Sequence, residues 1–448
     1  MSDPSSSASG AVYRAFWRWH FYAGLLVMPV LMLMALTGGL YLFRGDIDDV
    51  IYRPLMFVEA RAEQAAPDAW AKAALAAVPG RLASVTVPAA EDRPARLVVE
   101  SEGHGRRAVY VDPHDARVLG EIPDGGAMAV VKRVHSLDIA GSVFNIGVEI
   151  VAGWAMVMVA TGIVLWWPRG QKGGVVSVRG APGRRVFWRD LHAVTGVFVG
   201  GVIVFLAATG MPWSAVWGQQ VRKMTTEAGW GRPAAPVATA GGHEGHESHE
   251  GHDAPAPAVP WALQETTLAA SAAPALPLGA MMGHVEALGL PRPYTVTIPK
   301  APGAAWSAAY MPDKVEATRT LYLDGATGQA VADIGYDRFG PAAKTIEWGI
   351  AVHQGQQFGL VNKLVMLAGC VAIWLLGISG LTMWWKRRPK GRLAAPPAPA
   401  DKRGYVALAA VVIPLGILYP LVGASLVAVL TLDLVLRRLF VQRREAQA

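Results

Sequence analysis

The sequence predicts a membrane all-α bundle of four core transmembrane helices, with a further C-terminal helix or hairpin and two small α+β domains outside the bilayer. Four apolar stretches are long enough to cross a hydrocarbon core of roughly 30 Å as helices. Two long segments of mixed polarity separate them, and the sequence around the first two stretches is repeated around the last two. Hydrophobic residues make up 52% of the 448 residues and charged residues only 17%, which is unusual for a soluble protein.

The predicted elements follow one another along the whole chain. They are an N-terminal segment 1–19, a first span 20–43, a first long segment 44–134, a second span with its preceding histidine segment 135–167, a loop 168–190, a third span 191–213, a second long segment 214–347, a fourth span with its preceding histidine segment 348–385, a loop 386–404, an apolar stretch 405–436 and a tail 437–448. The stretch 405–436 contains Pro414 and Pro420, so it predicts either a kinked helix or a tight hairpin.

The distribution of charge predicts the orientation in the membrane. The segments 1–19, 168–190, 386–404 and 437–448 together hold 19 Lys/Arg and 4 acidic residues, whereas the two long segments hold 21 Lys/Arg and 27 acidic residues. Because basic loops stay in the cytoplasm, we expect both long segments to be periplasmic. Basic residues on both sides of the stretch 405–436 favour the hairpin. The net charge of +7 is therefore a topology signal, and we expect no nucleic-acid binding.

An internal repeat relates the two halves of the chain. His20 precedes Thr37-Gly38 by seventeen residues, and His192 precedes Thr209-Gly210 by the same distance. In the same way, His135 and His353 each lie thirty-one residues before a Trp-Trp pair. Thr161-Gly162 and Ser379-Gly380 also match in position. The sequence therefore predicts a duplicated unit of span, outer domain and span.

Both long segments contain short runs typical of strands. The first segment predicts strands at 96–100, 108–112 and 117–121, and the second predicts strands at 294–298, 307–311, 320–325 and 327–331. The segment 233–260 is rich in Ala, Gly and Pro, which predicts a flexible tether. This tether carries a tract that could bind Zn, Cu, Ni or iron transiently or could equally be a solvated linker: His243, His246, His249 and His252.

The four repeated histidines are the strongest functional signal, because ionisable residues within membrane spans are rare and usually functional. Topology sorts them into an inner pair, His20 and His192, and an outer pair, His135 and His353. Each pair takes one histidine from each half, and two facing imidazoles are the axial ligands of a low-spin haem iron. We therefore predict two haem b groups. Gly24 and Gly196, four residues after the inner ligands, would leave room for a porphyrin.

The alternative for a single histidine is an interfacial or capping role. A Cu or Zn site is the alternative for a pair, although no Cys, Met or carboxylate ligand lies nearby. Arg18, Arg189, Asn145 and Lys363 are candidates for contacts to haem propionates or for second-shell positions, with membrane anchoring and interhelical hydrogen bonds as the alternatives. Glu149 is unusual because it lies inside a predicted span. The outer histidines His104, His114 and His284 are expected to have surface or structural roles.

Other classes of site are missing from the sequence. The single cysteine, Cys370, excludes an intramolecular disulfide and thiolate metal clusters. No nucleotide-binding fingerprint, nucleophile motif or paired-carboxylate signature stands out, and the short cytoplasmic segments offer no flavin or nicotinamide site. A quinol or another, unknown donor must therefore supply electrons.

The motifs FWRWHFYAGL, RVHSLDIAG, FWRDLHAVTGV and AVHQGQQFGL, in this order, resemble the PepSY-associated transmembrane helix family, over residues 11–436. The resemblance implies a multi-pass protein of the bacterial inner membrane with PepSY-like periplasmic domains. Some members look like haem-containing reductases of ferric siderophores. It therefore implies reduction of a ferric siderophore, or another ferric chelate, in the periplasm with release of Fe(II). The alternatives are a haem-free scaffold or peptidase-regulating module and a periplasmic Cu or Zn handling protein.

Overall fold

The computed structural model describes residues 4–168, 173–231, 259–263, 268–271, 273–389, 396, 401 and 403–431. The chain divides into two compact units, each built from several segments. The helical unit comprises residues 1–39, 134–221 and 364–448, and the sheet unit comprises residues 40–133 and 222–363.

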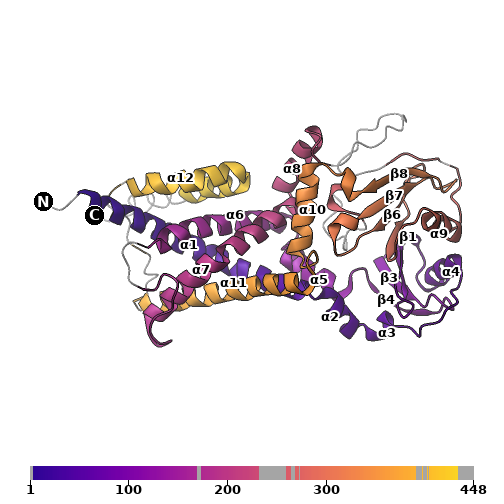
Figure 1. Ribbon diagram of the computed structural model, residues 1–448, viewed down its shortest axis with the longest axis horizontal. Helices are drawn as coiled ribbons and strands as arrows, with labels where there is room; N and C mark the ends of the chain where they lie inside the picture. The colour runs from indigo at the N-terminus through magenta and orange to yellow at the C-terminus, as the bar shows by residue number, and fades with distance from the viewer. Residues whose placement is uncertain are drawn as a thin grey trace, which may run out of the picture. The chain divides into compact units, whose positions relative to one another are not determined.

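Within the described residues, four helices are long and apolar enough to span a membrane. These helices are α1 (Pro4–Tyr41), α6 (Ser142–Trp166), α7 (Arg185–Gly210) and α11 (Gly359–Arg387) (Figure 1). They overlap the four predicted spans. The first helix begins sixteen residues before His20, so this histidine lies within a helix instead of at its start.

The four spanning helices meet in an apolar core within the helical unit. Its buried members come from all four helices: Ala35, Ala155, Ile203, Ile373 and Leu376. Glycines bring some helices close together. A Cβ at Gly377 would lie 2.3 Å from Met32 Sδ, and one at Gly369 would lie 2.8 Å from Val202 Cγ1. Small residues allow such close approach between helices in a membrane.

The apolar stretch at the C-terminus forms two short helices instead of one long one. Helix α12 (Arg403–Leu418) ends before Tyr419, and a second apolar helix covers Pro420–Thr431. A Cβ on Gly416 would lie 3.1 Å from Gly423 Cα, although seven residues separate them. A continuous helix would hold these residues about 10 Å apart. The chain therefore reverses direction here, as the hairpin alternative requires.

The sheet unit is built on one antiparallel sheet of eight strands in the order β4-β3-β2-β1-β5-β6-β7-β8. The strands are β1 (Arg81–Val87), β2 (Ala95–Ser101), β3 (Gly105–Val111), β4 (Val118–Pro123), β5 (Tyr294–Thr297), β6 (Trp306–Tyr310), β7 (Arg319–Leu323) and β8 (Ala330–Gly335). Each group of four is a meander that follows a helix: α4 (Pro67–Ala77) precedes β1, and α9 (Leu278–Ala287) precedes β5.

The two meanders share their central edge, where β1 pairs with β5 and Val85 lies opposite Val296. The sequence predicts two separate domains, whereas the structure joins the strands of both long segments into one sheet. Pairing β1 with β5 gives each meander a partner for an otherwise unpaired edge strand. Strand β1, which makes this connection, is not among the strands predicted from the sequence.

Helices α4 and α9 pack on the same face of the sheet (Figure 1). Trp70 and Met281 from these helices join Val85, Leu97 and Leu321 of the strands in one buried core. The remaining helices are α2 (Arg44–Ile51), α3 (Arg53–Met56), α5 (Gly126–His135), α8 (Trp217–Glu227), α10 (Pro341–His353) and the 3₁₀ helices η1 (Asp138–Ala140), η2 (Met211–Trp213), η3 (Trp261–Leu263), η4 (Val315–Ala317) and η5 (Tyr336–Arg338).

Candidate functional site

Two of the four predicted ligands, His20 and His192, face each other in the helical unit. His20 lies in the middle of α1 and His192 in the second turn of α7, and both side chains are half-buried. Their ring centroids are 6.3 Å apart, and the ring planes are nearly perpendicular at 88°. The structure therefore brings together one histidine from each half of the sequence repeat.

A hydroxyl group on another helix contacts each of these rings. His20 Nδ1 lies 2.9 Å from Thr161 Oγ1 of α6. His192 Nδ1 lies 3.1 Å from Ser379 Oγ of α11 and 3.1 Å from the carbonyl oxygen of Leu376. Because Nδ1 is engaged in both rings, Nε2 is the nitrogen that each ring can offer to a metal.

His135, at the end of α5, has the same environment. Its Nδ1 lies 2.9 Å from the carbonyl oxygen of Met34 and 3.1 Å from Thr37 Oγ1, both on α1. Asn145, which was predicted to contact a haem propionate or to support a ligand, is buried and donates from Nδ2 to the carbonyl oxygen of Ser136 at 3.0 Å. Asn145 thus fixes the backbone directly after the histidine.

His353, at the end of α10, is half-buried and belongs to the sheet unit. The buried Asn362 donates from Nδ2 to the carbonyl oxygen of Val352 at 2.8 Å, next to this histidine. Lys363 was the residue predicted to support this histidine, but its Nζ lies 4.0 Å from Asp46 Oδ2 instead. His135 belongs to the helical unit and His353 to the sheet unit, so the pairing of these two histidines stays a prediction from the sequence.

The two arginines beside the inner pair have protein partners. Arg18 donates to the carbonyl oxygen of Pro396 at 2.6 Å and lies over the ring of Tyr22. Arg189 donates twice to Asp190, at 2.9 and 2.6 Å, and the Asp190 side chain is fully buried. The buried carboxylate therefore accounts for Arg189 through a charge-assisted pair.

The separation of the inner-pair rings is compatible with two imidazoles that share one metal ion. A metal–nitrogen bond of about 2 Å, with each ring centre about 1 Å beyond the nitrogen, separates the two centroids by about 6 Å. The observed 6.3 Å agrees with this value.

A Cβ on Gly24 would lie 3.6 Å from Met158, and one on Gly196 would lie 3.7 Å from Leu376, so these glycines contact neighbouring helices. No group of three or more His, Cys, Asp or Glu suited to a metal occurs among the described residues.

The unusual acid of the spans, Glu149 of α6, has a structural explanation. Its side chain is fully buried, and Oε2 accepts hydrogen bonds from the backbone N–H groups of Val216 at 3.3 Å and Trp217 at 3.0 Å. Trp217 is the first residue of α8. A carboxylate at a helix N-terminus satisfies N–H groups that have no partner within the helix.

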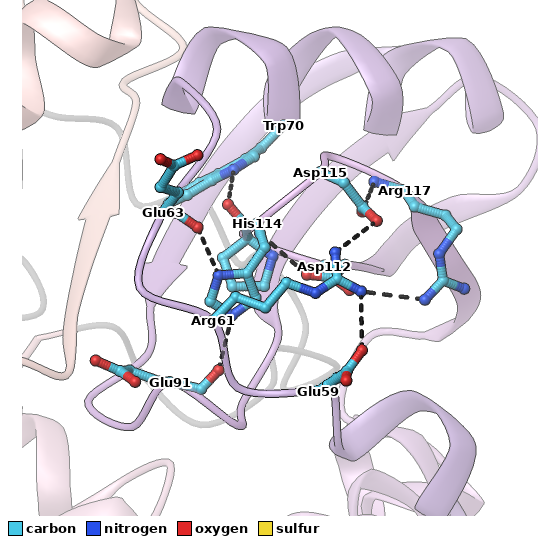
Figure 2. Close-up of polar contacts among 10 residues, drawn as sticks. Glu59, Arg61, Glu63, Trp70, Glu91, Asp112, His114, Asp115 and Arg117 are labelled. Carbon is cyan, nitrogen blue, oxygen red and sulfur yellow. Dashed lines mark hydrogen bonds and ion pairs between the residues drawn. The ribbon is translucent and has the colours of Figure 1, made fainter.

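His114 has a structural role in the sheet unit. Its Nδ1 lies 2.7 Å from the carbonyl oxygen of Glu63, and its Nε2 lies 2.9 Å from the carbonyl oxygen of Glu91 (Figure 2). The neighbouring carbonyl of Pro113 accepts from Trp70 Nε1 at 3.2 Å. The hydrogen bonds to Glu91 and Glu63 raise the pKa of His114, because carbonyl oxygens can only accept.

The remaining histidines named in the sequence analysis do not belong to the inner pair. His104 is exposed in the turn between β2 and β3, and His284 of α9 packs against Gly328. The histidine tract lies outside the described residues: His243, His246, His249 and His252.

Sequence reasoning noticed the Thr/Ser-Gly pairs only as markers of the repeat. The structure shows that Thr37, Thr161 and Ser379 are hydrogen-bonding partners of three histidines. The signal that could have revealed them was their constant spacing from the histidines. Asn362 was missed in favour of its neighbour Lys363.

The chain matches one family model, described as the PepSY-associated TM region, over residues 17–387. The matched range contains all four repeated histidines and their Thr/Ser-Gly pairs. A search of curated proteins finds no match to the chain.

Proposed function

Since the chain belongs to the family of the PepSY-associated TM region, we propose that it is a membrane haem protein that reduces a ferric chelate, such as a ferric siderophore. One observation carries the proposal: His20 and His192 face each other with ring centroids 6.3 Å apart. This separation matches two axial imidazoles on one iron. The surrounding spans are apolar, as a buried porphyrin requires.

In this proposal, His20 and His192 hold the iron of one haem b through Nε2, and His135 and His353 hold the iron of a second. When bound, the two groups supply one-electron transfer across the bilayer. The protein fixes the rings of the inner pair with hydroxyl groups from α6 and α11. It also pairs Arg189 with the buried Asp190, which Arg179 contacts as well, so this carboxylate offsets one of the two positive charges beside the site.

The proposed setting is the bacterial inner membrane, with the basic ends of the spans in the cytoplasm and the sheet in the periplasm. The two helix-and-meander halves of the sheet unit correspond to the two expected PepSY-like domains. The repeat of span, helix-and-meander and span then reflects an internal duplication. The electron donor is a quinol of the bilayer or a partner protein.

The chemistry accounts for the release of iron. Siderophores bind Fe(III) through hard oxygen ligands, which hold Fe(II) far less tightly. Each ferric ion takes one electron, so a quinol that gives two electrons and two protons would serve two ferric ions. The products are Fe(II), the free chelator and the quinone.

The test is direct reduction of a ferric chelate by the purified protein. We expect dithionite-reduced protein, freed of excess reductant, to be reoxidised by ferric siderophore, with one Fe(II) trapped by a ferrous-specific dye for each electron lost. The His20→Ala variant should retain only the outer haem and therefore yield about half as much Fe(II) per protein chain as the wild type. Reoxidation by oxygen but not by any ferric chelate of a panel would contradict the proposed substrate. Protein without any b-type spectrum would instead favour the haem-free scaffold.

A further inference from the structure

We propose that three Thr/Ser-Gly pairs act as ring seats, positioning residues that hold a ligand histidine in the tautomer and orientation that iron requires. This inference rests on the proposed haem function and deepens it. A ring seat is defined here as one such pair on the helix that faces the histidine. The seats are Thr161-Gly162 for His20, Ser379-Gly380 for His192 and Thr37-Gly38 for His135.

The hydroxyl of each seat is oriented by its own helix. Each one lies close to the carbonyl oxygen four residues earlier: Thr37 Oγ1 to Leu33 at 2.8 Å, Thr161 Oγ1 to Val157 at 2.8 Å and Ser379 Oγ to Leu375 at 2.6 Å. A hydroxyl has one hydrogen and two lone pairs. When the hydrogen points to the carbonyl, a lone pair is left to accept a hydrogen bond from the histidine.

The backbone of the seat fixes which ring nitrogen carries the hydrogen. His135 Nδ1 lies 2.9 Å from the carbonyl oxygen of Met34, and His192 Nδ1 lies 3.1 Å from that of Leu376. A carbonyl oxygen can only accept, so Nδ1 must be the protonated nitrogen in both rings. Nε2 then keeps its lone pair, which is the form of imidazole that binds a metal.

The glycine of each seat lies against the edge of the histidine ring. A Cβ would lie 3.2 Å from His135 Cε1 at Gly38, 3.4 Å from His20 Cε1 at Gly162 and 3.5 Å from His192 Cε1 at Gly380. The three distances are alike because the three rings sit on their seats in the same way. The hydroxyl residue therefore supplies the hydrogen-bond acceptor in all three seats, and the glycine supplies needed space at Gly38, because 3.4 and 3.5 Å are ordinary van der Waals contacts.

The seats lie within each half of the repeat, whereas the ligand pairs join the halves. Helix α1 carries His20 and also the seat of His135, and α6 carries the seat of His20. Helix α7 carries His192, whose seat lies on α11. Each ring of the inner pair is thus oriented by a helix that carries neither ligand of that pair. The orientation of the ring is therefore fixed independently of the bound iron.

The test removes the hydroxyl and leaves the ligands in place. Thr161→Val is close in volume to the native side chain, and Ser379→Ala removes only the hydroxyl oxygen. Thr382→Val is the matched control, because Thr382 also lies on α11 and donates to the carbonyl four residues earlier, Ile378, at 2.7 Å. The measurements are haem content, the midpoint potentials from a redox titration and the electron paramagnetic resonance spectrum of the ferric protein.

We expect Thr161→Val and Ser379→Ala to keep both haems but to favour the ferrous form of one haem about tenfold, since a hydrogen-bonded imidazole is the stronger donor. A tenfold change corresponds to a rise of about 59 mV for a one-electron couple. Thr382→Val and the conservative Thr161→Ser should match the wild type. Unchanged potentials and resonance spectra in both hydroxyl-free variants would overturn the ring seats while leaving the proposed function intact. Wild-type protein without haem would overturn both.

Discussion

The imidazole rings of His20 and His192 stand nearly perpendicular to each other, at 88°, with 6.3 Å between their centroids. The two residues are 172 positions apart in the sequence and come from corresponding places in its two halves. Hydroxyl groups on two further helices contact their Nδ1 atoms. The angle between the rings is therefore set by the packing of four helices, and it leads to a spectroscopic prediction.

Perpendicular axial imidazoles leave the iron orbitals nearly degenerate, which makes the resonance of a low-spin ferric haem highly anisotropic. We expect the electron paramagnetic resonance spectrum of the oxidised protein to contain one such signal from the inner haem. The signal should disappear in His192→Ala. Purely rhombic low-spin signals, typical of parallel imidazoles, would show that the rings of the inner pair do not keep this geometry around iron.

Two adjacent glycines of α1 should respond differently to a methyl group. A Cβ on Gly38 would lie 3.2 Å from His135 Cε1, whereas one on Gly39 would lie 3.7 Å from Cys370 and Leu367, an ordinary contact. Overpacking of this kind costs roughly 1–3 kcal/mol. We therefore expect Gly38→Ala to lower the haem content or shift the potential of the haem bound by His135, as measured by pyridine haemochrome and redox titration. Equal effects of Gly39→Ala would contradict this account.

The contacts of His114 predict a pH-dependent stability of the sheet unit. Both ring nitrogens face carbonyl oxygens, of Glu91 and Glu63, so only the protonated ring can donate to both. The pKa of His114 is raised above its ordinary value of 6.5, chiefly by these two hydrogen bonds. The stabilisation is therefore fully present below pH 6.5 and is lost as the pH rises through the raised pKa.

We expect this loss to appear at the backbone that His114 holds in place. The amide of Ala65 donates to the carbonyl oxygen of Pro113, the residue before His114, at 2.8 Å. Its hydrogen-exchange protection factor should fall between pH 6 and pH 9 in the wild type. In His114→Gln the factor should be lower at pH 6 and nearly independent of pH. A protection factor in the wild type that does not change with pH would refute the prediction.

Glu347 of α10 predicts a second pH effect in the sheet unit. It is only 6% exposed, and burial raises its pKa from 4.5 to about 7, although its Oε1 accepts from the Ala262 amide at 2.8 Å. Its contribution to stability is present below pH 4.5 and is lost as the pH rises through 7. At 1.36 kcal/mol per pKa unit the loss approaches about 3 kcal/mol.

Replacing Glu347 by glutamine removes the charge and keeps the acceptor oxygen. We expect Glu347→Gln to raise the thermal unfolding temperature of the full chain at pH 8 and to leave it unchanged at pH 4. The exposed Glu59→Gln serves as the control, with no change at either pH. A lower unfolding temperature of Glu347→Gln at pH 8 would mean that the carboxylate is stabilised by its surroundings.

The sequence was sufficient to locate the four spans, because a length of apolar residues is a strong signal. The strands β2, β3, β4, β5, β6 and β7 were also predicted with small differences in their bounds, and β8 was predicted a few residues too early, since alternation and turn residues mark these strands. Strand β1 was missed because Arg81–Val87 has no flanking hairpin turn with a clear sequence signature. The joining of the two meanders depends on the pairing of β1 with β5, which no local pattern encodes.

The candidate site likewise has features that the sequence pattern predicts and features that depend on how the helices pack. The register of the repeat was enough to propose His20 with His192, because each histidine lies seventeen residues before a Thr-Gly pair. The hydrogen bonds that join the two histidines to Thr161 and Ser379 could not be predicted, since they depend on which faces of α1, α6, α7 and α11 meet. The pairing of Arg189 with Asp190 likewise follows from the burial of the carboxylate, which the sequence does not reveal.

The central claim is that His20 and His192 hold one haem together, and haem stoichiometry tests it most directly. Purified wild type, His20→Ala, His192→Ala and the double variant would be compared by pyridine haemochrome per protein chain, after expression with haem available. We expect two haems in the wild type, one in each single variant and one in the double variant. Protein without haem, or a double variant that loses more haem than either single variant, would contradict it.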